Sequence, residues 1–291
     1  MGMNSTQFHS FILAGYSDIG RLKYFYLFII TALYISILFA NTLLIVVICT
    51  ERSLHKPMYL FLCSLFVNDL YGSTALFPAL MTNLVSDDHS VSTVNLAVMS
   101  YDRYLAICYP LQYNVLMAPK KVCILVCVTW LFTFVNDIIH LSLTLRLQLC
   151  GNVIEKLYCD NYLVVKLACS TSDMTVNNIF GLCGFVVLFA VPLFTICLSY
   201  IKILTICLKS STENRQKAFN TCTPHLASLL NFSFGCFLIL IQSRIDRPRQ
   251  NVPAVLHTVL SVYFLMCQPL FNPIVYGVRM DKIRQACKNI L

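Results

Sequence analysis

The segment Asp88-His-Ser-Val-Ser-Thr-Val-Asn-Leu-Ala-Val-Met-Ser-Tyr-Asp-Arg-Tyr-Leu-Ala-Ile-Cys108 decides the fold of this chain. Only 13 residues separate Asp88 from Asp102, and six of them are polar. A helix of 13 residues rises about 20 Å, whereas the hydrocarbon core of a membrane is roughly 30 Å thick. This segment is therefore too short before Asp102 for a full membrane span, whereas the other expected spans are long enough.

The composition of the whole chain places it among membrane proteins. Of its 291 residues, 58% are hydrophobic and 12% are charged, and a soluble domain carries about twice that charged fraction. Residues 24–50, 174–201, 218–243 and 250–278 carry no charge, and each run is long enough for a spanning helix. Two further runs are broken only by Asp69 and by Asp137. The sequence predicts an all-α polytopic membrane protein, a seven-helix bundle with a shortened third helix.

The charges set the orientation of the expected spans. With the N-terminus outside, 13 of the 21 Lys and Arg residues lie on the cytoplasmic side, in agreement with the positive-inside rule. We expect an outer segment 1–23 without a cleavable signal peptide, a membrane domain 24–277 and a cytoplasmic tail 278–291. The expected spans are 24–50, 57–84, 91–108, 122–143, 174–207, 218–242 and 252–277.

Several function classes are disfavoured by the same patterns. The net charge of +8 fits a basic inner fringe facing anionic lipid or an acidic partner, and no aromatic-interleaved basic patch indicates nucleic acid. No nucleophile, base and orienting group cluster at a recognisable spacing, so we expect no enzyme and no cofactor. A transporter stays as an alternative of another class, although transporters usually show inverted repeats and nothing in this chain repeats.

Five motifs occur in order along nearly the whole chain. They are Leu54-His-Lys-Pro-Met-Tyr-Leu-Phe-Leu62 with Asp69, Met99 to Cys108 followed by Tyr109-Pro-Leu-Gln-Tyr113, Ser199-Tyr200, Lys217-Ala-Phe-Asn-Thr-Cys-Thr-Pro-His-Leu226, and Pro269-Leu-Phe-Asn-Pro-Ile-Val-Tyr276. Together they resemble the olfactory receptors, the odorant branch of the rhodopsin-like G protein-coupled receptors, and the wording of the second and third motifs is similar to fish-type members. The resemblance implies a plasma-membrane receptor that binds small odorants and activates a stimulatory olfactory G protein and adenylyl cyclase.

The resemblance assigns activation and G protein coupling to residues at the inner ends of the helices. Arg103, paired with Asp102 at rest, is expected to contact the G protein on activation. The alternative is a plain interfacial anchor, since a cation at a membrane boundary must be paired or extend to water. Pro273 is expected to act as a hinge and Tyr276 to swing inward, against the alternative of a static kink. The full expected set is Asp102, Arg103, Tyr104, Tyr200, Lys217, Pro273 and Tyr276.

A polar core is expected around Asp69, because a carboxylate in the middle of a span needs a partner or a cation. The resemblance implies Asn41 and Asn272 as its neighbours and a sodium-binding pocket. Ser92, ten residues before Asp102, takes the position where an acidic side chain normally completes that pocket. A water-filled structural network without a cation is the alternative.

Odorant contacts are expected from the outer halves of the helices. An apolar cavity with a few polar groups suits small odorants, although each candidate could equally serve helix packing. The candidates are Phe180, Phe185, Phe234, Leu238, His257 and Val259. In addition, Asn4 begins an N-glycosylation triplet on the outer N-terminal segment.

Three cysteines, Cys150, Cys159 and Cys169, lie in a polar segment that the predicted topology places on the oxidising side. No His accompanies them at ligand spacing, so we expect disulfide chemistry rather than a metal site. The resemblance pairs Cys150 with Cys169. It also leaves Cys159 unpaired, because the usual partner of Cys159 belongs to the outer half of helix three.

That outer half is what the sequence lacks, since the resemblance breaks between Val91 and Asn95. Either helix three inserts short, with one wall of the odorant pocket missing, or it does not span and every later loop changes side. We expect the short insertion and a chain that signals poorly or not at all. The alternative to a working receptor is accordingly a truncated or mispredicted one that is retained in the endoplasmic reticulum.

Overall fold

The computed structural model describes residues 12–13, 23–82, 89–151, 153–154, 161–209, 211–245 and 254–290. In these ranges, seven long helical segments follow one another, which confirms the expected all-α bundle. They are α1 (Lys23–Thr50), α2 (Pro57–Thr82), α3 (His89–Cys108), α5 (Pro119–Leu145), α7 (Thr171–Phe185) continuing through η4 (Val186–Ala190) into α8 (Val191–Leu208), α9 (Thr212–Ile245) and α10 (Ala254–Arg279).

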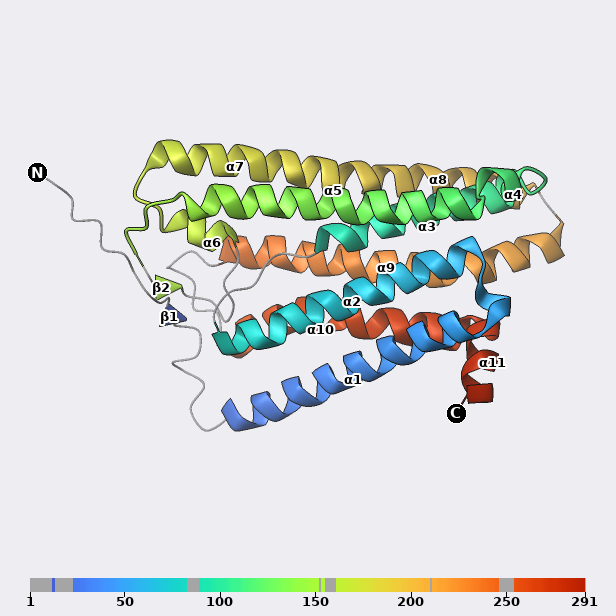
Figure 1. The fold of residues 1–291 in the computed structure, drawn as a ribbon, viewed down its shortest axis with the longest axis horizontal. Helices are drawn as coiled ribbons and strands as arrows, with labels where there is room; N and C mark the ends of the chain where they lie inside the picture. The colour runs from blue at the N-terminus through green and yellow to red at the C-terminus, as the bar shows by residue number, and fades with distance from the viewer. Residues whose placement is uncertain are drawn as a thin grey trace, which may run out of the picture.

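Short elements join the long helices at both ends of the bundle. They are η3 (Arg52–Leu54), α4 (Tyr113–Leu116), α6 (Asn161–Lys166), α11 (Asp281–Ile290) and the strands β1 (Ile12–Leu13) and β2 (Val153–Ile154), which pair in parallel. Figure 1 shows α4 and α11 at one end of the bundle and α6, β1 and β2 at the other. We call these the inner and the outer end.

Helix α3 differs from its neighbours in length and position. It has 20 residues, whereas α2 has 26 and α5 has 27. In Figure 1, α3 begins near the middle of the bundle, while α5 runs along most of it. Its polar side chains Ser92, Thr93 and Asn95 are buried, so the first turns of α3 lie inside the bundle.

The apolar core lies at the inner half of the bundle. Fully buried side chains there include Phe61 and Leu65 of α2, Met99 of α3, Ile196 of α8 and Tyr276 of α10. Burial of a large apolar side chain contributes about 1.5–3 kcal/mol. The helices that carry the five motifs are therefore packed together at their inner ends.

The outward faces of α5, α7 and α8 carry exposed apolar side chains. Leu131 and Leu182 are each 65% exposed and Phe194 is 64% exposed. Apolar faces of this extent need lipid or a partner around them. By length and composition alone, three helices within the described ranges could cross a membrane, at Phe28–Thr50, Pro119–Leu145 and Thr171–Leu208.

The helix pair α7 and α8 is joined by a turn of π-helix just before Pro192. Proline has no backbone N–H, and its ring clashes with the carbonyl four residues back. A wider turn at this point gives that carbonyl room within the helix. The turn keeps one continuous helical rod from Thr171 to Leu208.

Candidate functional site

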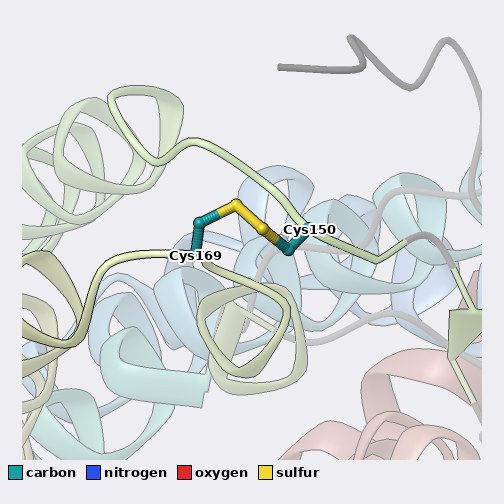
Figure 2. Close-up of a disulfide and its surroundings, with 2 residues drawn as sticks. All are labelled: Cys150 and Cys169. Carbon is teal, nitrogen blue, oxygen red and sulfur yellow. A yellow bond between two sulfur atoms is a disulfide. The ribbon is translucent and has the colours of Figure 1, made fainter. Parts of the chain in front are cut away.

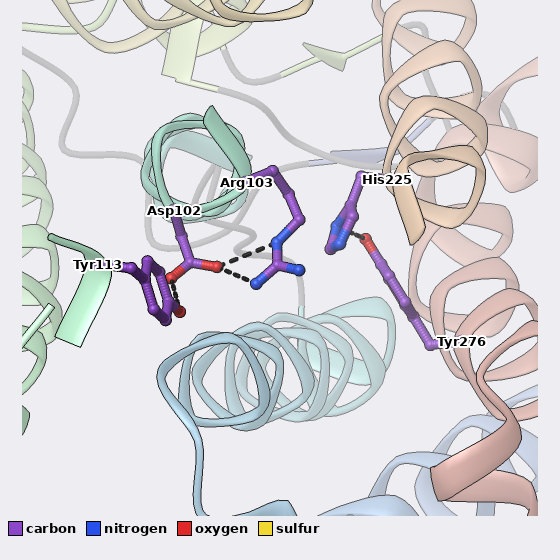
Figure 3. A network of polar contacts seen from close by, with 5 residues as sticks. All are labelled: Asp102, Arg103, Tyr113, His225 and Tyr276. Carbon is purple, nitrogen blue, oxygen red and sulfur yellow. Dashed lines mark hydrogen bonds and ion pairs between the residues drawn. The ribbon is translucent and has the colours of Figure 1, made fainter. Parts of the chain in front are cut away.

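At the inner end, an ion pair joins two adjacent residues of α3. The Arg103 guanidinium donates to the Asp102 carboxylate through Nε (3.0 Å) and through Nη2, and both residues are buried. The second oxygen of Asp102 accepts a hydrogen bond from the Tyr113 hydroxyl at 2.7 Å. We call Asp102, Arg103 and Tyr113 the inner latch (Figure 3). Burying a charged side chain without a partner is costly. The pairing of Asp102 with Arg103 and the hydrogen bond from Tyr113 offset that cost.

Tyr113 reaches Asp102 because the chain turns back after α3. Residues 109–112 form a tight connection, and α4 places Tyr113 at its first position. Burial, followed by the neighbouring Asp102 carboxylate, raises the pKa of Tyr113. The phenol therefore keeps its proton and acts as the donor. Tyr113 lies in the motif that follows helix three, and no role was predicted for it from the sequence.

A second polar contact joins α9 to α10 beside the latch. His225 Nδ1 and the Tyr276 hydroxyl lie 3.1 Å apart, and both side chains are buried. The Tyr276 ring also meets Phe66 of α2 edge to face, with centroids 6.2 Å apart. In Figure 3, the Arg103 guanidinium points from α3 toward His225. The structure thus brings Tyr276 and Arg103, two predicted residues, into one neighbourhood through His225, which the sequence analysis did not assign.

Other predicted coupling residues surround this neighbourhood. Tyr200 is buried on α8, and its hydroxyl has no hydrogen-bond partner in the part of the chain that the structure describes. The Tyr104 ring lies under the Lys202 ammonium, 5.7 Å from its centroid, and its hydroxyl contacts that of Tyr109. Lys217 lies in the first turns of α9.

Asp69, Asn272 and Asn41 lie in the middle of the bundle, as a polar core. Asn272 Nδ2 donates to Asp69 Oδ2 at 2.8 Å, and Asn272 Oδ1 accepts from Ser228 of α9 at 2.6 Å. All of these side chains are buried. One amide therefore links α2, α9 and α10, and its loss would leave two buried polar groups without a partner.

Asn41 joins α1 to this core by a different contact. Its Nδ2 donates to the Pro269 carbonyl of α10 at 2.9 Å and to its own helix at the Ile37 carbonyl. The carbonyl of Pro269 is the one that Pro273, four residues later, leaves without a helical donor. Asn41 therefore satisfies the backbone group that the proline of the helix-seven motif sets free.

A polar seam runs between α2, α3 and α5. Asn68 donates to Ser92 at 2.6 Å, Ser64 donates to Asn95 at 3.3 Å, and Trp130 Nε1 donates to Ser64 at 2.9 Å. The hydroxyl of Ser92, at the position where the family resemblance implies an acidic side chain, thus already accepts a hydrogen bond from Asn68. Among the described residues, no group of three His, Cys, Asp or Glu side chains could hold a metal ion.

The six predicted odorant contacts lie on three helices. On α7, Phe180 packs edge to face on His140, and Phe185 stacks on Phe189 and is 48% exposed. On α9, Phe234 meets Tyr263 edge to face. Leu238 also lies on α9, and His257 and Val259 lie on α10. Their role in binding stays a prediction, since helix packing accounts for each described ring contact.

The outer end carries a disulfide between Cys150 and Cys169, 19 residues apart in sequence (Figure 2). Beside it, the Cys150 N–H donates to the Leu167 carbonyl and the Cys169 N–H to the Gln148 carbonyl, each at 2.8 Å. These contacts close the ends of the loop between α5 and α7 on each other. We call this loop the second outer loop. Cys159 and Asn4, for which an unpaired thiol and a glycan were expected, lie outside the described residues.

The helix bundle, the buried Asp102–Arg103 pair and the proline-containing α10 define a membrane receptor of the seven-helix class. A family model described as "Olfactory receptor" matches residues 30–94 and 88–291. Human olfactory receptor 11A1 is 35% identical over 97% of this chain and 93% of its own length. Mouse olfactory receptor 5AP2 is 35% identical over 99% and 95%, and human olfactory receptor 2K2 is 31% identical over 100% and 96%. The chain belongs to the olfactory receptor family.

Proposed function

We propose that this chain is an odorant receptor whose inner end activates a stimulatory G protein, raising cAMP at the plasma membrane. The observation that carries the proposal is the inner latch. It holds Arg103 inside the bundle by a paired carboxylate and a tyrosine hydroxyl. A cation so held can be released to a partner by breaking its two hydrogen bonds to Asp102, without unfolding any helix.

In this proposal, odorant binding at the outer halves favours a state with α9 moved outward. A ligand shifts such an equilibrium only through different affinity for the two states. Outward movement of α9 separates His225 from Tyr276, frees Tyr276 to swing inward and opens the space beside Arg103. The buried Tyr200 hydroxyl, without a described partner at rest, is then available to Tyr276 or to Arg103.

We further propose that the missing outer half of helix three makes the chain as written a weak signaller. Two observations support this. Helix α3 has 20 residues, whereas α2 has 26 and α5 has 27, and the two matches of the family model overlap at residues 88–94. Such a receptor would lack one wall of the odorant pocket and would be partly retained in the endoplasmic reticulum.

The test is odorant-evoked cAMP in cells, normalised to receptor at the cell surface. A panel of small volatile compounds is applied to the chain as written and to a variant that carries the corresponding outer half of helix three from a relative. We expect responses from the restored variant and markedly weaker ones from the chain as written. Absence of any response from a restored variant that reaches the surface would contradict the receptor function.

A further inference from the structure

Side chains at the outer end make a connection that the motifs did not predict. His140 and Thr144 of α5, Asn161 of the loop helix α6 and Asn177 of α7 form one hydrogen-bonded group. We call it the outer clamp. Asn161 Nδ2 donates to His140 Nδ1 at 2.7 Å, and the Thr144 hydroxyl donates to Asn161 Oδ1 at 2.5 Å. The side-chain nitrogen and oxygen of Asn161 are thus both bound by residues that lie one turn apart on α5.

The clamp extends from α5 to α7 through Asn177, which is buried. Its Oδ1 lies 3.5 Å from the Thr144 hydroxyl, and its Nδ2 donates to the Leu143 carbonyl near the end of α5 at 3.4 Å. These contacts fix the spacing of α5 and α7 at the level where α6 docks. Figure 1 shows α6 beside the outer ends of these two helices.

The imidazole of His140 packs against α7, and its Nδ1 lies within hydrogen-bond distance of Asn161 of α6. Phe180 of α7 packs edge to face against it, with centroids 5.2 Å apart. A Cβ added to Gly181 would lie 3.4 Å from His140 Nε2, an ordinary contact distance, so α7 packs closely against the ring. With Nδ1 accepting from Asn161, the ring has one orientation and one set of partners.

We infer that His140 and Asn161 are positioning residues that hold the second outer loop over the odorant site without help from helix three. All the contacts named for Asn161 go to α5, and the disulfide closes the loop ends on each other. Helix α6 and the two disulfide-linked ends of the loop are therefore held on α5 whatever the length of α3. The role of the loop in odorant binding rests on the proposed function. The hydrogen bonds of the clamp do not depend on it.

Hydrogen exchange on the full chain in lipid nanodiscs, without odorant or G protein, tests the clamp directly. The amides of Leu167, Ala168 and Cys169 are hydrogen-bonded and report on the docked loop. We expect His140→Ala, which removes one hydrogen bond of Asn161, to speed their exchange about five- to tenfold. Asn161→Ala, which also removes the bond from Thr144, should speed it at least as much. The double variant should be no faster than Asn161→Ala alone, because His140 acts on the loop through Asn161.

His140→Asn is the matched control, because its amide oxygen can accept from Asn161 where Nδ1 does. It should keep the exchange of the loop near that of the parent, and amides of α3 should stay unchanged in every variant. Unchanged loop exchange in both alanine variants, or additive effects in the double variant, would overturn the clamp.

A second readout separates positioning from simple stability. In the receptor with a restored helix three, Asn161→Ala should raise the odorant concentration for half-maximal cAMP about tenfold and leave the maximal response unchanged. A lower maximum with unchanged potency would overturn the positioning role. Loss of the receptor function itself would show as no cAMP in the restored parent, while the exchange result would stand.

Discussion

Arg103 is a cation that is only 9% exposed, and its retention in the bundle depends on what compensates it. A buried charge without a partner costs several kcal/mol, whereas a paired and hydrogen-bonded one is tolerated. Asp102 supplies the pairing, and Tyr113 satisfies the second carboxylate oxygen. At the scale of single residues, Asp102 and Tyr113 therefore set the resting state. Weakening the hydrogen bonds of either side chain should favour release of Arg103.

Tyr113→Phe tests this release. The substitution removes the hydroxyl that donates to Asp102 and leaves the ring in place. Hydrogen bonds to charged groups contribute about 1.5–3 kcal/mol, so we expect ligand-independent cAMP in the restored receptor to rise about tenfold at equal surface amount. Tyr109→Phe is the matched control, because Tyr109 contacts only the Tyr104 hydroxyl among its described side-chain hydrogen bonds. Equal basal cAMP in the two variants would contradict the latch.

Asn41→Ala tests whether the carbonyl freed by Pro273 needs its donor. Without Asn41, the Pro269 carbonyl is buried and unpaired, which costs about 1–3 kcal/mol. We expect a clear drop in the melting temperature of the solubilised protein. Ser36→Ala, which removes a hydrogen bond to Ala32 on the exposed side of the same helix, should leave the melting temperature nearly unchanged. A comparable drop in both variants would argue against a specific role for Asn41.

At the scale of elements, the loop between α5 and α7 is held by its own disulfide and by the hydrogen bonds of Asn161 to α5. Its disulfide constrains the unfolded chain, and for a loop of about 20 residues the entropic model gives roughly 3 kcal/mol. We expect Cys150→Ser with Cys169→Ser to lower the melting temperature and the surface amount. Cys183→Ser with Cys197→Ser, two exposed free thiols, should change neither. A stable double Cys150 and Cys169 variant would show that the clamp alone holds the loop.

The sequence predicted the helical bundle because long uncharged runs leave few alternatives to spanning helices. The need of a carboxylate in a span for a polar partner was predicted from the residues, but Asn272 was named as that partner only by the family resemblance, and the structure joins Asn272 to Asp69 at 2.8 Å. The contacts of Tyr113 and of His140 could not be read from spacing. Each depends on how a connecting segment turns back on a helix end, and neither turn has a periodic pattern.

The tail and the start of helix three show the same limit at larger scale. Residues 278–291 were expected only as a cytoplasmic tail, yet Asp281–Ile290 forms α11, in which Ile283 is fully buried. A search for long apolar runs does not detect this helix, because the segment contains several charged residues. The short third span was predicted by counting residues against the thickness of a membrane; α3 has 20 residues, whereas α2 has 26, and the loss of its outer half stays a prediction.

At the scale of the whole molecule, the inner half holds the packed core, the latch and the polar core, and α3 is shorter than α2 and α5. The residues of these three features lie outside the segment from Val91 to Asn95, where the family resemblance breaks. We therefore predict that this chain is impaired in odorant capture and in delivery to the surface, and not in its coupling to G protein.

The most direct measurement compares two chains in the same cells, the chain as written and the variant with the outer half of helix three restored. Surface amount and odorant-evoked cAMP are measured together, and the two chains differ only in the length of helix three, which has 20 residues in the chain as written. We predict a clear gain in both surface amount and cAMP per receptor. Equal cAMP per surface receptor from the two chains would contradict it.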